Sequence, residues 1–191
     1  MSIAEFALGF AGIIIGLGVA DLLVSLHRLV RARARVTWDW LALSFAGLQM
    51  LLSVILWWYI YFWFRAHDGA SFLEFLPNIL LLCVSFLMMA AALPDEVPAE
   101  GLVLREAYMA NRAQPWTLLA VWIALNLVIQ SLENWRLREF RLTEAVVAAG
   151  LLLCLALAAA GARSTRPWVH VLAITIIALL IVAPMLAVRF V

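Results

Sequence analysis

The sequence predicts an all-α fold, a polytopic membrane bundle of six transmembrane helices with a short interfacial helix in the third loop. Hydrophobic residues make up 67% of the 191 residues and charged residues only 13%, whereas ordinary soluble domains are about 45–50% apolar. The apolar residues form continuous runs, and tryptophans gather at the run ends, as they do at membrane–water interfaces. A chain of this size has room for one domain, so we expect residues 1–191 to form a single transmembrane domain.

Each expected span holds about the 20 mostly apolar residues that a membrane-crossing helix needs. We expect helices because an open sheet would leave unpaired backbone groups in hydrocarbon. The runs are also continuous and do not alternate as a half-buried strand would. The six expected spans are residues 6–29, 38–64, 72–93, 116–135, 142–161 and 168–188.

The third connection, residues 94–115, is the longest. Pro98 suits the first turn of a helix, because its missing N–H would be unpaired there in any case. From Leu102 to Met109, apolar and charged residues alternate at roughly helical spacing. We therefore expect a short amphipathic helix of about two turns at the membrane interface.

The distribution of arginines predicts which loops face the cytoplasm. All 13 basic residues are arginines, and four of them crowd the first loop. Cytoplasmic loops carry an excess of basic residues, so we expect the first loop inside and both termini outside. A second arginine cluster at residues 136–141 falls on the opposite side and opposes this assignment.

Three segments carry a resemblance to known proteins. They are residues 93–98 (LPDEVP), residues 104–112 (LREAYMANR), and the arginine-rich first turn that ends in residues 38–40 (WDW). With these segments the chain resembles a broad group of bacterial six-span inner-membrane proteins over most of its length. The resemblance implies a bacterial cytoplasmic membrane and a similar topology. It implies no established activity and no catalytic residues.

Asp21 is the sharpest functional candidate. It lies eight residues before Leu29, the last residue of the first expected span, so it sits about 12 Å deep at 1.5 Å per residue. A carboxylate inside a membrane costs about 2.5–3.5 kcal/mol on insertion scales and usually faces the bundle interior or a wet cavity. It is therefore a candidate proton or cation site. The alternative is a structural acid that pairs with Ser25 and Arg28 further along the same helix.

Other polar residues are expected near the same depth. Asn126, Gln130 and Glu133 fall on one stripe of the fourth span, and Gln49 lies in the second span. One interpretation is a path for an ion or small solute. The other is interhelical hydrogen bonding that holds the bundle together, worth about 0.6 kcal/mol per bond. The complete predicted path consists of Asp21, Gln49, Asn126, Gln130 and Glu133.

Two further features suggest contacts within the membrane. Gly12, Gly16 and Ala20 form a ridge of small residues, which favours either a homodimer or close packing inside the bundle. The aromatic block at residues 57–64 would either form a slot for a flat lipid or quinone or anchor the helix at the interface. Its candidate lipid or quinone contacts are Trp57, Trp58 and Trp63.

Polar residues at the loop ends are candidates for gating or for binding a partner membrane protein: His27, Arg28, Arg105, Tyr108 and Arg112. The sequence has no CxxC, no Cys/His cluster, no HExxH, no nucleophile elbow and no phosphate-binding glycine loop. We therefore expect no enzyme activity, no cofactor and no metal. A net charge of +1 gives no bias toward nucleic acid, so the expected partners are membrane lipids, a second copy of the chain, or another membrane protein.

These observations support three functional hypotheses. The leading one is passive or proton-coupled movement of a small ion or solute, with Asp21 as the central ionisable group. The second is a non-transporting scaffold or accessory subunit that acts through the glycine ridge and the charged third loop. The third is a lipid or quinone binder that uses the aromatic block.

Overall fold

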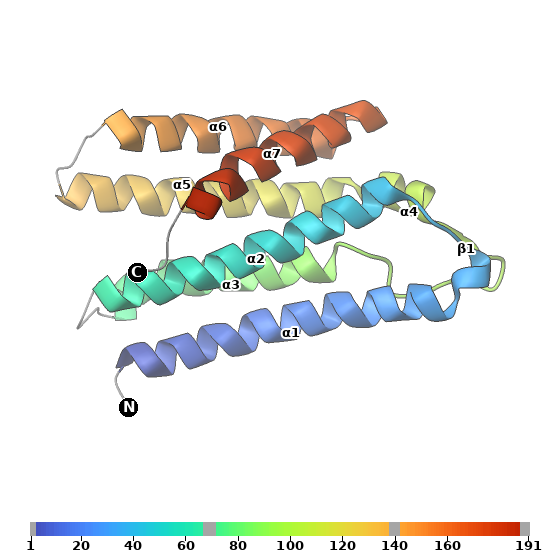
Figure 1. The fold of residues 1–191 in the computed structure, drawn as a ribbon, viewed down its shortest axis with the longest axis horizontal. Helices are drawn as coiled ribbons and strands as arrows, with labels where there is room; N and C mark the ends of the chain where they lie inside the picture. Colours follow the sequence, from blue (N-terminus) through green and yellow to red (C-terminus); the bar gives the residue numbers. More distant parts are fainter. Residues whose placement is uncertain (1–2, 67–71, 138–141, 188–191) are drawn as a thin grey trace. The chain divides into compact units, whose positions relative to one another are not determined.

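The computed structural model describes residues 3–66, 72–137 and 142–187 (Figure 1). The all-α prediction is confirmed, since the helices account for nearly all of these residues. The only strands among them, β1 (Val36–Thr37) and β2 (Leu102–Val103), have two residues each, and a short 3-10 turn, η1, covers Arg33–Arg35. The α-helices are α1 (Ile3–Arg31), α2 (Trp40–Ala66), α3 (Phe72–Ala90), α4 (Leu104–Asn111), α5 (Ala113–Leu137), α6 (Leu142–Arg163) and α7 (Pro167–Ala187).

Each predicted span coincides with a long helix, but length and composition support fewer crossings than six. Within the described residues, four stretches are long and apolar enough to cross a membrane: Ala7–Arg31, Trp40–Trp63, Ala113–Trp135 and Leu142–Arg163. The apolar parts of α3 and α7, Phe75–Ala90 and Pro167–Ile181, are shorter. The apolar helices are compatible with an integral membrane protein, while crossings by α3 and α7 stay a proposal.

The chain divides into two compact units, Met1–Ala110 and Asn111–Val191, which are described separately below. In the first unit, α1, α2 and α3 all contact one another. Glycine allows α1 to approach α3 closely: a Cβ on Gly18 would overlap the end of the Met89 side chain and lie 3.4 Å from the Phe86 Cα. Such close approach favours dispersion contacts between helices that have no hydrophobic drive in lipid.

The first and third loops are joined by β1 and β2, a contact that the sequence did not predict. The strands pair in parallel, Val36 with Leu102 and Thr37 with Val103. Gly101 precedes the pair with φ +105°, and a Cβ there would lie 3.0 Å from the Arg35 carbonyl oxygen. Only glycine adopts this conformation without strain.

The short helix expected in the third loop is present as α4. It begins at Leu104, two residues later than expected, because residues 102–103 are extended in β2. The second long helix likewise begins at Trp40 and not at Trp38. The Asp39 carboxylate accepts hydrogen bonds from the N–H groups of Leu41 (3.0 Å) and Ala42 (3.4 Å), which caps the first turn of α2.

The second unit is built from α5, α6 and α7, in which α6 contacts both of the other helices. Gly161 of α6 lies against the fully buried Trp116 of α5. A Cβ on Gly161 would lie only 2.5 Å from Cδ2 of that ring. His170 meets the same indole edge-on, with ring centroids 5.5 Å apart, and its Nε2 lies 3.0 Å from the Ser164 carbonyl oxygen. A residue without a side chain therefore makes room for the largest buried ring of this unit.

Candidate functional site

The polar residues predicted to line a path belong to both compact units. Asp21 and Gln49 lie on α1 and α2 of the first unit, whereas Asn126, Gln130 and Glu133 lie on α5 of the second. A continuous path through all five residues therefore stays a prediction.

Gln49 is the most unusual polar side chain of the first unit. It is 0% exposed, and within the described residues neither its Nε2 nor its Oε1 has a hydrogen-bond partner. Ser53, one turn further along α2, does not supply one, because its hydroxyl donates to the Gln49 backbone carbonyl at 3.0 Å. Buried amides are almost always hydrogen-bonded to protein or water. The amide nitrogen and oxygen of Gln49 are thus both available to hydrogen-bond a water or a polar ligand.

Helix register places Asp21 at about the same level as Gln49. Helices α1 and α2 run in opposite directions (Figure 1), and a Cβ on Gly12 would lie 3.9 Å from Trp57 Nε1. Asp21 follows Gly12 by nine residues and Gln49 precedes Trp57 by eight, so both lie about 12–14 Å from this contact at 1.5 Å per residue. Asp21 is half-exposed and makes no ion pair or hydrogen bond with the residues that the structure describes.

The alternative pairing of Asp21 with Ser25 and Arg28 is wrong, because both residues bind Asp95 of the third loop. Ser25 Oγ donates a hydrogen bond to Asp95 Oδ1 at 2.7 Å. Arg28 Nη1 donates to the Asp95 backbone oxygen at 3.1 Å and lies 3.8 Å from Oδ1. Asp95 of the third loop is therefore the partner of both polar side chains that the structural alternative assigned to Asp21.

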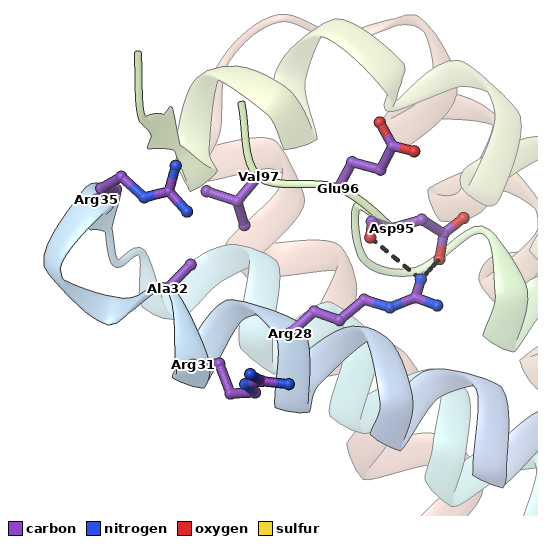
Figure 2. Close-up of a pocket in the computed structure, with 7 residues that line it drawn as sticks. All are labelled: Arg28, Arg31, Ala32, Arg35, Asp95, Glu96 and Val97. Atoms are coloured by element: carbon purple, nitrogen blue, oxygen red, sulfur yellow. Dashed lines mark hydrogen bonds and ion pairs between the residues drawn. The ribbon is translucent and has the colours of Figure 1, made fainter. Parts of the chain in front are cut away.

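The Arg28–Asp95 contact joins the two walls of a pocket of about 630 Å³ at the end of α1 (Figure 2). Arg28, Arg31 and Arg35 reach it from the α1 side, and the opposite wall is the Asp95–Val97 stretch. Arg35 Nη1 also donates to the Pro98 carbonyl oxygen, at 3.4 Å. The pocket lining is Arg28, Arg31, Ala32, Arg35, Asp95, Glu96 and Val97.

Sequence reasoning missed this pocket, because 67 residues separate the two partners of its central contact. One local signal was available. Arg28 and Arg31 lie three residues apart in the last turn of α1 and so share one helix face, and Arg35 follows in η1. The second half of the site, the acidic stretch of the third loop, is placed by tertiary contacts, which include the β1–β2 pairing and the hydrogen bonds of Ser25 and Arg28 with Asp95.

Two of the residues expected to gate or bind a partner fix α4 within the first unit. Arg105 Nη1 lies 3.8 Å from Asp39 Oδ2, so α4 is linked to the start of α2. Tyr108 is 6% exposed, and its ring centroid lies 5.6 Å from that of Phe45. His27 is exposed and Arg112 is half-buried. A gating or partner-binding role for these residues stays a prediction.

In the second unit, the polar stripe of α5 is divided among different partners. Asn126 Nδ2 donates to the Trp122 carbonyl oxygen of its own helix at 2.9 Å. Asn134 Nδ2 donates across to Glu144 Oε2 of α6 at 3.3 Å. Gln130 differs, because its Oε1 is buried without a hydrogen-bond partner among the described residues. Glu133 is half-buried.

The small-residue ridge of α1 is split between two environments. Gly12 lies against Trp57, whereas Gly16 and Ala20 are exposed and nothing lies within 4 Å of a Cβ placed on Gly16. The close helix contact is made instead by Gly18, outside the ridge. A homodimer through the exposed part of the ridge stays a prediction.

The aromatic block packs largely on itself. Tyr61 stacks at an interplanar angle of 25° on both Trp57 and Trp58, at centroid distances of 6.2 and 6.0 Å. Phe62 meets Trp58 edge-on at 5.1 Å. These are neighbours three and four residues apart on one helix face, and Trp63 is half-buried beside them. Contact of the block with a lipid or quinone stays a prediction.

Comparisons with known proteins add no family to this description. No protein-family model matches the chain. No curated protein and no solved structure matches it either. Two features of the first unit bear most directly on function. They are Asp21 and Gln49, which lie at about the same level of α1 and α2, and the arginine-lined pocket at the end of α1.

Proposed function

We propose that the protein is an integral membrane protein that binds a small cation or polar solute inside its first helical unit and lets it cross the membrane. The observation that carries the proposal is the Gln49 side chain, which is fully buried while both of its polar atoms lack a hydrogen-bond partner among the described residues. Asp21 is the ionisable group assigned to the same level.

The energetics favour an occupant beside Gln49. A buried polar group without a hydrogen bond costs about 1–3 kcal/mol, and a leucine of similar volume would avoid that cost. Water or a polar ligand would remove the cost by bonding the amide oxygen and nitrogen. The carboxylate of Asp21 would make a cation the preferred charged species, because attraction between charges is strong where water is scarce.

Ionisable residues within a membrane span are by themselves candidate functional groups, since they are costly to insert. Asp21 fits this description because it lies inside the apolar stretch Ala7–Arg31. Ser25 and Arg28, the partners that the structural alternative gives it, bind Asp95 instead. The proposal needs only the first unit.

The test is flux through purified protein in liposomes, followed with a pH-sensitive dye and with Na⁺ and K⁺ indicators. We expect Asp21→Asn to lower the flux at least about tenfold, which corresponds to about 1.4 kcal/mol in the barrier. Glu100→Gln is the matched control, because it removes one exposed carboxylate outside the long helices. Wild-type flux no greater than that of empty liposomes, or equal flux through Asp21→Asn, would refute the proposal.

A different observation favours an accessory or scaffold role. The third loop is held in one shape by β1–β2 pairing, by the Asp39–Arg105 ion pair and by the Phe45–Tyr108 contact. A preformed surface of this kind suits a partner protein. Copurification of a stoichiometric membrane protein that is lost in Arg105→Ala, while flux is absent in the wild type, would favour this second function.

A further inference from the structure

We propose that the pocket at the end of α1 binds the phosphate group of an anionic phospholipid. The proposal is independent of ion movement through Asp21, because it uses other residues at the polar end of the helix. It concerns the face formed by Arg28, Arg31 and Arg35 and the loop stretch opposite them (Figure 2).

The three guanidinium groups suit a phosphate. Each presents a planar fork of N–H donors that matches phosphate oxygens. Arg28 and Arg35 are anchored by the carbonyl oxygens of Asp95 (3.1 Å) and Pro98 (3.4 Å), which orients them at the pocket while leaving further donors. Arg31 is exposed and makes no hydrogen bond or ion pair with the part of the chain that the structure describes.

The charge balance of the pocket favours an anion over a neutral group. Asp95 is the carboxylate nearest the arginines, yet its side chain and that of Arg28 are 62% and 53% exposed at a separation of 3.8 Å. An exposed ion pair of this length is weak, so it competes poorly with a phosphate. Figure 2 shows the Glu96 carboxylate turned away from the arginines. The negative end of the α1 dipole offsets only about half a charge.

The position of the pocket favours a lipid as the source of the phosphate. Arg31 is the last residue of the apolar stretch Ala7–Arg31, so its guanidinium lies where a membrane-spanning helix would reach the headgroup layer. Basic pockets in this position bind anionic lipid headgroups. The volume of about 630 Å³ falls within the usual range of small-ligand sites, about 300–1,000 Å³. Ala32 and Val97 add apolar surface for the glycerol end of the lipid.

The experiment measures lipid binding to the full chain in a neutral detergent by native mass spectrometry. Phosphatidylglycerol and phosphatidylcholine with identical acyl chains are the two lipid probes. We expect phosphatidylglycerol to bind at least about tenfold more tightly, a difference of about 1.4 kcal/mol. Equal binding of the two lipids would overturn the proposal.

Variants locate the site on the protein. We expect Arg31→Gln to weaken phosphatidylglycerol binding about fivefold, and Asp95→Asn to strengthen it a few-fold because it removes a competitor for Arg28. The matched control is Arg163→Gln, another exposed arginine in the last turn of a candidate span, α6. Equal loss in Arg31→Gln and Arg163→Gln would mean diffuse surface charge and would overturn the pocket. An unchanged melting temperature of Arg31→Gln confirms that the loss is not unfolding.

A final arm separates the two sources of phosphate. Glycerol phosphate carries the headgroup chemistry without the acyl chains. We expect it to displace phosphatidylglycerol only at concentrations about a hundredfold higher than the lipid. Displacement at equal concentration would show that the pocket takes a soluble phosphate ester, and would overturn the assignment to lipid.

Discussion

The two compact units use the same material, three long apolar helices, in different ways. In the first unit the polar contacts join residues far apart in sequence: Ser25 with Asp95, and Arg35 with Pro98. In the second unit several side chains donate to a carbonyl four residues back on the same helix, as Asn126 and Thr175 do. Long-range polar contacts bring functional groups from distant segments together, whereas a bond to a carbonyl of the same helix only satisfies one side chain. The candidate sites therefore concentrate in the first unit.

The largest expected loss of stability comes from a change in the packing of the second unit. Gly161→Ala places a Cβ about 2.5 Å from the Trp116 ring. The ring is fully buried and cannot move aside easily, so we expect a loss of about 1–3 kcal/mol of stability. Thermal unfolding in detergent measures it. The matched control is Gly150→Ala on the same helix, where nothing lies within 4 Å of the new Cβ. Equal melting temperatures for the two variants would contradict the tight contact.

In the first unit, the loop geometry is the sensitive point. Gly101→Ala forces a side chain into φ +105° and toward the Arg35 carbonyl oxygen at 3.0 Å. We expect the protein to lose about 1–2 kcal/mol of stability. We also expect faster amide hydrogen exchange at the four paired residues, Val36, Thr37, Leu102 and Val103. Unaltered exchange there would show that the β1–β2 pairing does not depend on the glycine.

Gln49→Leu tests the buried amide, and unlike the two glycine variants it is expected to raise the stability of the protein. It removes two unpaired polar atoms from a fully buried position, so we expect the protein to become more stable by about 1 kcal/mol while flux falls. Gln114→Leu is the control on an exposed position. A clear loss of stability in Gln49→Leu would mean that the amide is hydrogen-bonded in the folded protein. Flux that is unchanged in this variant would favour the scaffold function.

The smallest effects separate the two roles of Asp39. Asp39→Ala removes the cap of α2, which we expect to cost about 1 kcal/mol. Arg105→Ala breaks a long ion pair, at 3.8 Å, in which the Arg105 side chain is 50% exposed and that of Asp39 is 11% exposed, so we expect a loss below about 0.5 kcal/mol. Chemical denaturation of the two variants compares the values. Because Asp39→Ala removes the cap and the ion pair together, a loss no larger than that of Arg105→Ala would show that the cap adds no stability.

The sequence predicted the helices well because the apolar runs are long and continuous. The predicted starts and ends of the spans lie within about three residues of the observed ones. Trp38 was placed inside a helix wrongly, since the pattern of apolar residues does not show that Val36 and Thr37 pair with a distant strand. Gln49 and Gln130 were identified as polar residues in apolar spans, but their lack of hydrogen bonds in the described structure could not be read from the sequence.

By itself, the amino-acid sequence determined the all-helical class, the positions of the long helices and the short helix of the third loop. These follow from hydrophobic periodicity and run length, which are local properties of the chain. Two features could be seen only in the folded structure. Ser25 and Arg28 bind Asp95 and not Asp21, and three arginines line a pocket together with the third loop. Partner choice among polar groups depends on which segments fold side by side, and a sequence pattern does not encode contacts between residues 67 or 70 positions apart.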